Sequence, residues 1–574
     1  MRRLLPYLRP YRKECVVSPL FKLFEALLEL AVPLVMAAII DNGIRTGDSG
    51  YVARMGLLLA GLGLMGFVAA ATAQYFAAKA AVGFATRLRS EMFGRIQRFA
   101  YADLDCQGAP TLINRMTTDI NQVQTGLNMA LRLLLRSPFV VFGAMIMAFV
   151  VDARAALVFV ALIPVLGAAV GGIMRLTLPR HKKTQAQLDR VLMRTRENLT
   201  GVRVLRAFNK QQSEIQAFDA DNEALCGMQL EVGRLGALSN PLTYVLVNLA
   251  LAALLYSGAL RVEAGALTQG AVVALVNYLS QILVELVKLA NLIVTITKAL
   301  ACAARIEGTL ALEPSMEAPA QPQAPAAAPE TVRFEHVSAR YHEGGEAALE
   351  DVSFTARRGQ TIGVIGGTGA GKTTLVNLIP RFYDVSAGRV LVDGTDVRQW
   401  DPKALRARIG VVPQRAALFA GTIRDNLRWG KRDATDEELW QALKTAQAEQ
   451  TVLAKPGGLD EPVRQGGRNF SGGQRQRLTI ARALTRQPEI LILDDSASAL
   501  DYATDAALRK ALRELPGGVT VFVVSQRVSA IRHADLILAL DDGRLAGMGT
   551  HEELLRDCAV YREICQSQSA GEVA

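Results

Sequence analysis

A glycine-rich segment, GGTGAGKTT (366–374), contains the residues of this chain that are best suited to chemistry. Gly366, Gly371, Lys372 and Thr373 have the spacing of a phosphate-binding loop. The glycines let backbone amides close around phosphate oxygens, the lysine neutralises their charge, and the threonine hydroxyl can bind Mg²⁺. The sequence therefore predicts a nucleotide site made by Gly366, Gly367, Thr368, Gly369, Ala370, Gly371, Lys372, Thr373 and Thr374.

A carboxylate is expected at the end of another buried strand beside such a loop. Asp494 follows the apolar run ILIL (490–493) and would hold Mg²⁺ through a water molecule. Taken alone, an aspartate after an apolar strand can simply mark the end of that strand. The phosphate loop is what favours the metal-binding interpretation of Asp494.

The elements that would position these residues alternate between strand-like and helical segments. The strand-like runs are TIGVIG (361–366), RIGVVP (408–413), EILILDD (489–495) and VTVFVVS (519–525). We expect an α/β domain over residues 331–574. Residues 313–330, EPSMEAPAQPQAPAAAPE, have the Ala and Pro content of an extended linker.

The first 312 residues have a different composition, with long apolar stretches. Segments of about 20 apolar residues can span a bilayer, and a soluble core would rarely need so many of them. We therefore expect an all-α domain with six transmembrane spans and two long polar connections. The candidate spans are 16–40, 55–82, 137–151, 155–174, 241–260 and about 266–297.

Charge is unevenly divided along the 574 residues. The formal net charge is +10; residues 1–330 hold 32 basic and 23 acidic residues, whereas residues 331–574 hold 32 and 31. The surplus lies at the N-terminus and in the long connections, so we expect these regions, both termini and the α/β domain to be cytoplasmic. This division disfavours a nucleic-acid partner. The hydrophobic content of 50% excludes disorder, and with all six cysteines on the cytoplasmic or membrane side we expect no disulfides.

The run NFSGGQRQRLTIARAL (469–484) lies between the phosphate loop and Asp494. This order resembles that of ATP-binding-cassette (ABC) ATPases. With six preceding spans, nearly the whole chain resembles a bacterial ABC exporter half-transporter. The segment ELAVPLVMAAIIDNGI, beginning at Glu29, resembles the heterodimeric exporters linked to multidrug efflux.

The resemblance implies roles for further residues in a dimer whose two ATPase domains face head to tail. Tyr341 would stack on adenine, although it could be an ordinary strand tyrosine, and Gln414 would contact Mg²⁺ and the attacking water. Asp501, in SALD, would lie at the interface between the ATPase domains. The signature residues would act on the partner's ATP: Ser471, Gly472, Gly473 and Gln474.

Two positions depart from the family's catalytic pattern. Asp495 stands where a glutamate usually polarises the attacking water, and Gln526 stands where a histidine usually contacts the γ-phosphate. Losing one methylene retracts the carboxylate by roughly 1.5 Å, which costs on the order of a hundredfold in rate. Glutamine can donate a hydrogen bond but cannot carry a proton. We expect this chain's own site to bind ATP and hydrolyse it poorly.

The intact signature favours a heterodimer over a slow homodimer. The partner would be a second ABC half-transporter chain that has the catalytic glutamate and the switch histidine. The expected activity is ATP-driven export of small amphipathic molecules through the lipid bilayer. A nucleotide-gated regulator or channel, a lipid flippase half and a peptide exporter half remain alternatives.

Two further features concern coupling and substrate. Residues 104–123 and 197–218 resemble the segments through which the spans of exporters contact the ATPase domains. Ionisable residues within spans are candidates for a transport path. We expect Glu29 and Glu285 to face a cavity and to favour cationic amphiphiles.

Overall fold

The computed structural model describes residues 4–323, 326, 328–341, 345–496, 499–515 and 517–569. Its contacts divide the chain into two compact units. The first comprises Met1–Gln97 and Pro110–Leu312, and the second comprises Arg98–Ala109 and Glu313–Ala574. The short segment Arg98–Ala109 therefore belongs with the second unit, although it lies within residues 1–312, predicted as the first domain.

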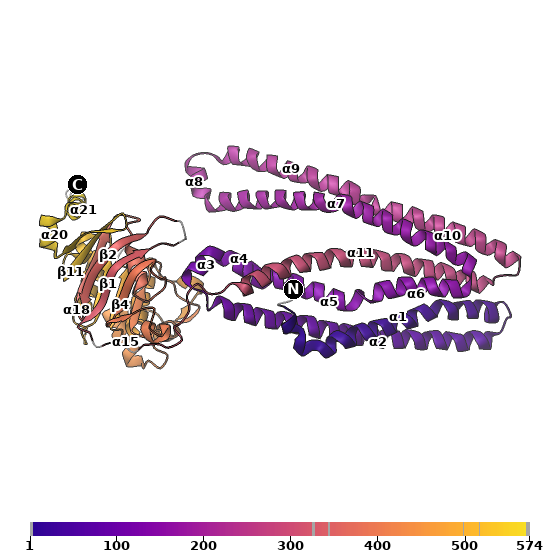
Figure 1. Ribbon diagram of the computed structural model, residues 1–574, viewed down its shortest axis with the longest axis horizontal. Coiled ribbons are helices and arrows are strands. Elements are labelled where there is room, and N and C mark those ends of the chain that lie inside the picture. The colour runs from indigo at the N-terminus through magenta and orange to yellow at the C-terminus, as the bar shows by residue number, and fades with distance from the viewer. Residues whose placement is uncertain are drawn as a thin grey trace. The chain divides into compact units, whose positions relative to one another are not determined.

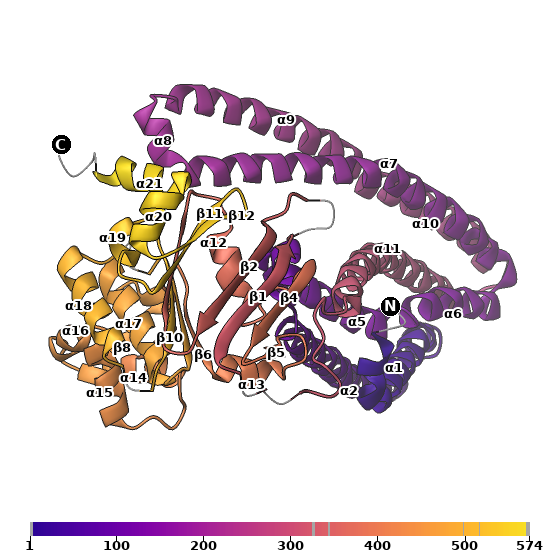
Figure 2. The same ribbon diagram turned by 60° about the vertical axis from the view of Figure 1, so that its left-hand side comes forward.

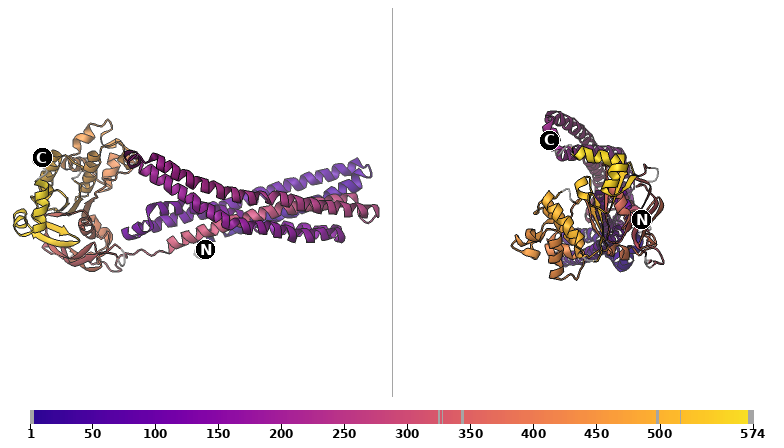
Figure 3. Two further views of the ribbon diagram at one scale, coloured as in Figure 1. Left: turned by 90° about the horizontal axis from the view of Figure 1, so that it is seen from above. Right: turned by 90° about the vertical axis from the view of Figure 1, so that its left-hand side faces the viewer.

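The first unit consists of long helices. Six helical stretches in the described residues are long and apolar enough to cross a membrane: Leu5–Ile44, Ser49–Ile96, Ala109–Val151, Ala153–Thr200, Gln211–Glu263 and Gln269–Ala311. They run alongside one another for much of their length (Figures 1 and 3). The main helices are α1 (Arg12–Ala38), α2 (Ser49–Ile96), α5 (Ile120–Leu133), α6 (Arg136–Val151), α7 (Ala153–Thr200), α9 (Gln211–Ala237), α10 (Ser239–Glu263) and α11 (Gln269–Ala311). The shorter helices between them are α4 (Ala109–Asn114) and α8 (Val202–Ala207).

Small residues bring the helices of this unit close together. Helix α2 buries a series of alanines, and the Ser18 hydroxyl on α1 donates a hydrogen bond to the Ala73 carbonyl at 2.9 Å. A Cβ at Gly83 would lie 2.2 Å from the Tyr11 ring, so a larger residue here would have to displace that ring. Without a hydrophobic driving force in lipid, such close backbone contact is a main source of helix association. Large apolar residues on the outer face, such as Phe67, are exposed.

The second unit contains the predicted α/β fold. Its central sheet has the strand order β12-β11-β3-β10-β9-β6, in which only β12 pairs antiparallel. These strands are β3 (Thr361–Gly366), β6 (Ile409–Val412), β9 (Ile490–Asp494), β10 (Thr520–Val524), β11 (Leu536–Asp541) and β12 (Arg544–Gly549). The four strand-like runs found in the sequence correspond to β3, β6, β9 and β10. The fold class is therefore confirmed.

A second sheet lies beside the first (Figure 2). It has the order β2-β1-β4-β5 and is antiparallel. Its strands are β1 (Glu330–Ala339), β2 (Leu349–Arg357), β4 (Ala387–Val392) and β5 (Thr395–Asp396). A two-stranded pair joins β7 (Gly421–Thr422) to β8 (Pro462–Val463).

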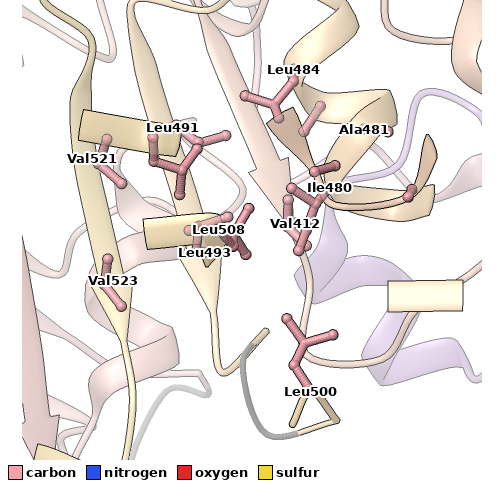
Figure 4. Close-up of a cluster of buried hydrophobic side chains, with 14 of the residues drawn as sticks. Val412, Ile480, Ala481, Leu484, Leu491, Leu493, Leu500, Leu508, Val521 and Val523 are labelled. Carbon is pink, nitrogen blue, oxygen red and sulfur yellow. The ribbon is translucent and has the colours of Figure 1, made fainter. Parts of the chain in front are cut away.

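The helices of the second unit pack around these sheets. They are α3 (Tyr101–Gln107), α12 (Lys372–Leu378), α13 (Pro402–Ala407), α14 (Ile423–Arg428), α15 (Asp436–Thr445), α16 (Glu449–Leu453), α17 (Gly472–Thr485), α18 (Tyr502–Arg513), α19 (Val528–Ile531), α20 (His551–Asp557) and α21 (Ala559–Ser569). Strand residues Leu491 and Val521 share one buried cluster with Ile480 of α17 and Leu508 of α18 (Figure 4). This core fixes the strand ends that carry the site.

Candidate nucleotide site

The phosphate loop joins β3 directly to α12. At its two ends glycine is required: a Cβ at Gly366 would lie 2.3 Å from the Leu540 carbonyl oxygen, and one at Gly371 would lie 2.4 Å from that of Ala348. Gly371 also has a φ of +88°, which non-glycine residues rarely adopt. The loop is therefore held against two backbone segments, while nothing lies within 4 Å of the Cβ direction of Gly367 or Gly369.

Lys372 is buried at the start of α12. Its Nζ donates hydrogen bonds to the carbonyl oxygens of Gly366, at 2.9 Å, and Gly367, at 2.5 Å. Burial lowers the pKa of this ammonium group, and the charges of Asp495 and Asp494 partly oppose that effect. A buried cation that bonds neutral carbonyls is well suited to an anionic ligand, since phosphate oxygens would supply the missing countercharge.

Thr373 and Asp494 are in direct contact beside the loop. The Thr373 hydroxyl lies 3.0 Å and 3.1 Å from the two carboxylate oxygens of Asp494, to which it donates. Burial raises the pKa of Asp494, an effect that the hydrogen bond from Thr373 opposes. A hydroxyl and a carboxylate are oxygen ligands of the kind Mg²⁺ prefers, often through water. The residues present therefore fit this ion.

A cavity of about 310 Å³ brings the predicted groups together from separate segments. Gln414 follows β6, Asp495 follows β9, and Gln526 follows β10. The Gln414 side-chain amide donates to a carboxylate oxygen of Asp495 at 3.3 Å. The cavity is lined by Tyr341, Ala348, Thr368 to Thr374, Gln414, Asp494, Asp495, Val524, Ser525 and Gln526. Asp495 has a φ of 46°, so its backbone turns sharply as the strand ends.

Tyr341 lies at the rim of this cavity, with 41% of its surface exposed. Its hydroxyl is 2.8 Å from the Thr374 hydroxyl, and its ring packs edge-on against Tyr383 with centroids 5.0 Å apart. Tyr383 was not among the predicted site residues. The aromatic pair FY (382–383), soon after α12, was the signal available.

Tyr383 also explains why Arg98–Ala109 belongs to the second unit. Its hydroxyl donates to Asp105 of α3 at 2.8 Å. The Tyr101 ring lies 4.7 Å from that of Phe382 and 6.1 Å from that of Tyr383, centroid to centroid. Burial, and then the Asp105 carboxylate, raise the pKa of Tyr383. The start of the predicted segment 104–123 is thus in contact with an aromatic group that borders the nucleotide cavity.

The signature residues lie outside this chain's own cavity. Ser471 caps α17. Its hydroxyl accepts a hydrogen bond from the backbone N–H of Gln474 at 3.3 Å, and the side-chain oxygen of Gln474 accepts one from the backbone N–H of Ser471 at 3.0 Å. Ser471 and Gly472 are exposed. Asp501 is also exposed and caps α18 by accepting from the Thr504 amide at 2.7 Å. These helix-capping residues are held in place at the surface, and they do not line the cavity around Lys372.

The two acidic residues expected on a transport path are joined by a buried arginine in the first unit. Arg136 donates to Glu285 at 2.6 Å and to Glu29 at 2.5 Å. Ser137 and Lys288 also donate to Glu285, each at 2.8 Å. The Glu285 side chain is only 3% exposed, whereas that of Glu29 is 41% exposed. Glu285 therefore balances the buried Arg136 and the more exposed Lys288, and of the two carboxylates only that of Glu29 has substantial exposure.

Arg136 was missed because it directly precedes the apolar run assigned as a span, 137–151. A neighbouring contact involves Pro33, which has no N–H and so leaves the Glu29 carbonyl without its helical donor. Gln281 of α11 donates to that carbonyl at 3.4 Å. Side chains of α6 and α11 thus meet α1 around Glu29.

A parallel sheet, a glycine loop between β3 and a helix, and a carboxylate at a second strand end define an ATP-binding P-loop domain, here joined to six candidate membrane helices. Family models agree with both parts. The model for the ABC transporter transmembrane region matches residues 15–286, and the ABC transporter model matches residues 349–498. The chain belongs to the ABC transporter family as an exporter half-transporter, a form that dimerises.

Relatives match along nearly the whole chain. An uncharacterized ABC transporter ATP-binding protein of Mycobacterium tuberculosis is 38% identical over 98% of this chain and 97% of its own length. The putative multidrug export ATP-binding/permease protein YgaD of Bacillus subtilis is 31% identical, covering 99% of each. The structure of a bacterial Atm1-family ABC exporter with ATP bound has the same fold, with a TM-score of 0.81, 24% identity and coverage of 97% and 98%.

Proposed function

We propose that this chain is one half of a heterodimeric exporter whose own P-loop site binds Mg²⁺ and ATP and hydrolyses the nucleotide slowly. The observation that carries the proposal is the composition of the cavity wall. Asp495 and Gln526 line the same cavity as Lys372 and Thr373. Binding groups are therefore complete, while two groups that act on the terminal phosphate and the water are altered.

The binding role follows from the groups already described. Lys372 would exchange its loop carbonyls for phosphate oxygens, and Tyr341 would stack on the base. Thr373, Asp494 and Gln414 would hold Mg²⁺, which neutralises charge on the phosphates when bound. Asp495 would orient the attacking water but with a carboxylate one methylene short. Gln526 can donate a hydrogen bond to the terminal phosphate, but unlike histidine it cannot take up a proton and become positively charged.

The exposed signature supports a second chain. Because Ser471 and Gly472 lie outside this chain's cavity on an ordered helix start, they are available to complete a site that another chain supplies. A partner with an intact catalytic glutamate and switch histidine would then hydrolyse its ATP against them, with Asp501 at the interface. In the homodimer, both sites would contain Asp495 and Gln526.

The test is ATPase activity of the purified chain alone and together with candidate half-transporter chains. The chain alone should turn over ATP slowly, and the pair with the correct partner chain should be about a hundredfold faster. This factor is the loss of rate attributed to the short carboxylate of Asp495. Turnover by the homodimer equal to that of the pair would refute the degenerate-site proposal. The variant Lys372→Ala serves as the control for nucleotide binding.

The exported molecule is proposed to be a small cationic amphiphile, with the ATPase domain and both termini in the cytoplasm. Support comes from the Glu29 carboxylate, whose side chain is 41% exposed although it pairs with Arg136, and from the 31% identity to YgaD, a putative multidrug export protein. Uptake of cationic and neutral dyes into inside-out vesicles tests both direction and charge preference. Glu29→Gln should weaken uptake of the cationic dye and spare the neutral one. Equal loss of both dyes would indicate a helix-packing role for Glu29.

A further inference from the structure

The segment that carries Gln526 is held from outside the nucleotide cavity by α21, the last helix among the described residues. Gln526 lies between β10 and the short helix α19, and it is one of the residues that line the cavity. Helix α21 packs beside α19 near the end of the described chain (Figure 2). One residue of α21, Gln568, reaches the main chain of this segment.

Both ends of the Gln568 side-chain amide are used. Its Oε1 accepts a hydrogen bond from the Val528 backbone N–H at 2.8 Å, and its Nε2 donates to the Gln526 carbonyl oxygen at 2.6 Å. The residue between them is held from the other side, because the Ser525 hydroxyl accepts from the Arg527 N–H at 3.0 Å. Three consecutive residues after β10 therefore have a backbone group fixed by a side chain.

Helix α21 is itself anchored in the domain core. Tyr561 is fully buried, and its hydroxyl lies 2.8 Å from Nδ1 of His551 on α20. Ile564 and Cys565, one turn before Gln568, pack against the cluster that contains Ile531 of α19. The amide of Gln568 is thus presented by a helix whose position the core already determines.

Glutamine is suited to this position because it carries one acceptor and two donors on the same planar group. Glutamate has the same length but, as the carboxylate, has no donor for the Gln526 carbonyl. Asparagine is shorter by one methylene, about 1.5 Å. The paired contacts therefore require both the chemistry and the length of glutamine.

We propose that Gln568 is a positioning residue for the nucleotide site: it fixes the main chain at Gln526 and so sets how far the Gln526 side chain reaches toward the terminal phosphate. The proposal depends on nucleotide binding at Lys372 but not on the identity of the second chain or on slow hydrolysis. It also gives α21 a role in distinguishing ATP from ADP at this site.

The test uses the full chain in lipid nanodiscs, with Gln568→Ala compared with Gln566→Ala. Gln566 is an exposed residue of the same type on the same helix, so it is the matched control. Amide hydrogen exchange at Val528 should become about tenfold faster in Gln568→Ala, because a typical hydrogen bond is lost. The ratio of ATP to ADP affinity, measured by competition with a fluorescent nucleotide, should fall about threefold to tenfold.

Exchange and nucleotide discrimination equal to those of Gln566→Ala would overturn the proposal. Faster exchange with unchanged discrimination would also overturn it, because Gln568 would then only hold the loop. If Gln568→Ala does not fold, Gln568→Glu provides the answer through nucleotide discrimination, since the carboxylate keeps the length and the acceptor for Val528 but replaces the donor to Gln526 by a negative charge. Loss of binding for both nucleotides in every chain, including the unaltered one, would instead contradict the proposed nucleotide site.

Discussion

Lengthening the carboxylate at position 495 is the most direct test of the proposed catalytic defect. A carboxylate oxygen of Asp495 lies 3.3 Å from the side-chain nitrogen of Gln414, and Asp495 lines a cavity of about 310 Å³. The cavity therefore leaves room for a longer side chain at position 495. Asp495→Glu extends the carboxylate by about 1.5 Å. The change places the charged group where a general base could contact a water molecule aligned with the terminal phosphate.

The magnitude follows from that distance. A displacement of about 1 Å in a reacting group can cost on the order of a hundredfold, and a hundredfold corresponds to about 2.7 kcal/mol in the activation barrier. We therefore expect Asp495→Glu to raise the turnover of the homodimer by up to about a hundredfold. Gln526→His should add to this increase, because it restores a group that can carry a proton.

The assay is steady-state phosphate release by the homodimer in nanodiscs at saturating Mg²⁺ and ATP. Asp495→Asn is the matched control, since it removes the charge at constant length and should not raise the rate. Lys372→Ala in the Asp495→Glu background should abolish the gain if hydrolysis occurs at this loop. Unchanged turnover in Asp495→Glu, with ATP binding retained, would refute the reasoning that the short carboxylate limits the reaction.

Three further predictions concern the ion network, the aromatic contact and pH. Arg136→Met should destabilise the protein by about 3–5 kcal/mol, because Glu285 loses a buried partner. In thermal unfolding, the double variant Arg136→Met with Glu285→Gln should recover much of this loss of stability. No recovery in the double variant would contradict the pairing. Tyr383→Phe should reduce ATP-driven dye uptake about threefold to tenfold through loss of the Asp105 hydrogen bond, and it should affect ATP affinity less. An equal reduction of dye uptake and of ATP affinity would mean that Tyr383 acts only in ATP binding. Burial raises the pKa of Asp494, so this carboxylate takes up a proton at a higher pH than an ordinary aspartate does. Its protonation should weaken Mg²⁺-dependent ATP binding as the pH falls toward this raised pKa. The same proton uptake favours the folded state. Binding titrations from pH 8 to about pH 5, with Asp494→Asn flattening the profile, test this sign.

Much of the fold was predictable because its signals are local. The glycine loop, the apolar strands before Asp494 and Gln526, and the long uncharged runs each depend on residues close together in sequence. Arg136 was missed for a related reason: it borders an apolar run, and its partners Glu29 and Glu285 lie on other helices. Sequence periodicity alone could not show that their charges would be balanced.

Contacts between distant segments were the least predictable part of the site. The bond from Tyr383 to Asp105 joins residues 278 positions apart, and Gln568 reaches Gln526 across 42 positions. Tyrosine, aspartate and glutamine are common surface residues, so their types give no indication of such pairing. Each contact depends on how whole helices are placed by the core, which a single sequence does not specify locally.

The length of α2 has a mechanical consequence. Its 48 residues contain no proline and extend about 72 Å at 1.5 Å per residue. The hydrocarbon layer is about 30 Å thick, so about 40 Å of continuous helix remains outside it. A change in tilt of about 10° about the helix centre would move each end by about 6 Å, more than the rise of one helical turn. Helix α2 can therefore act as a lever arm that amplifies small rotations among the membrane spans.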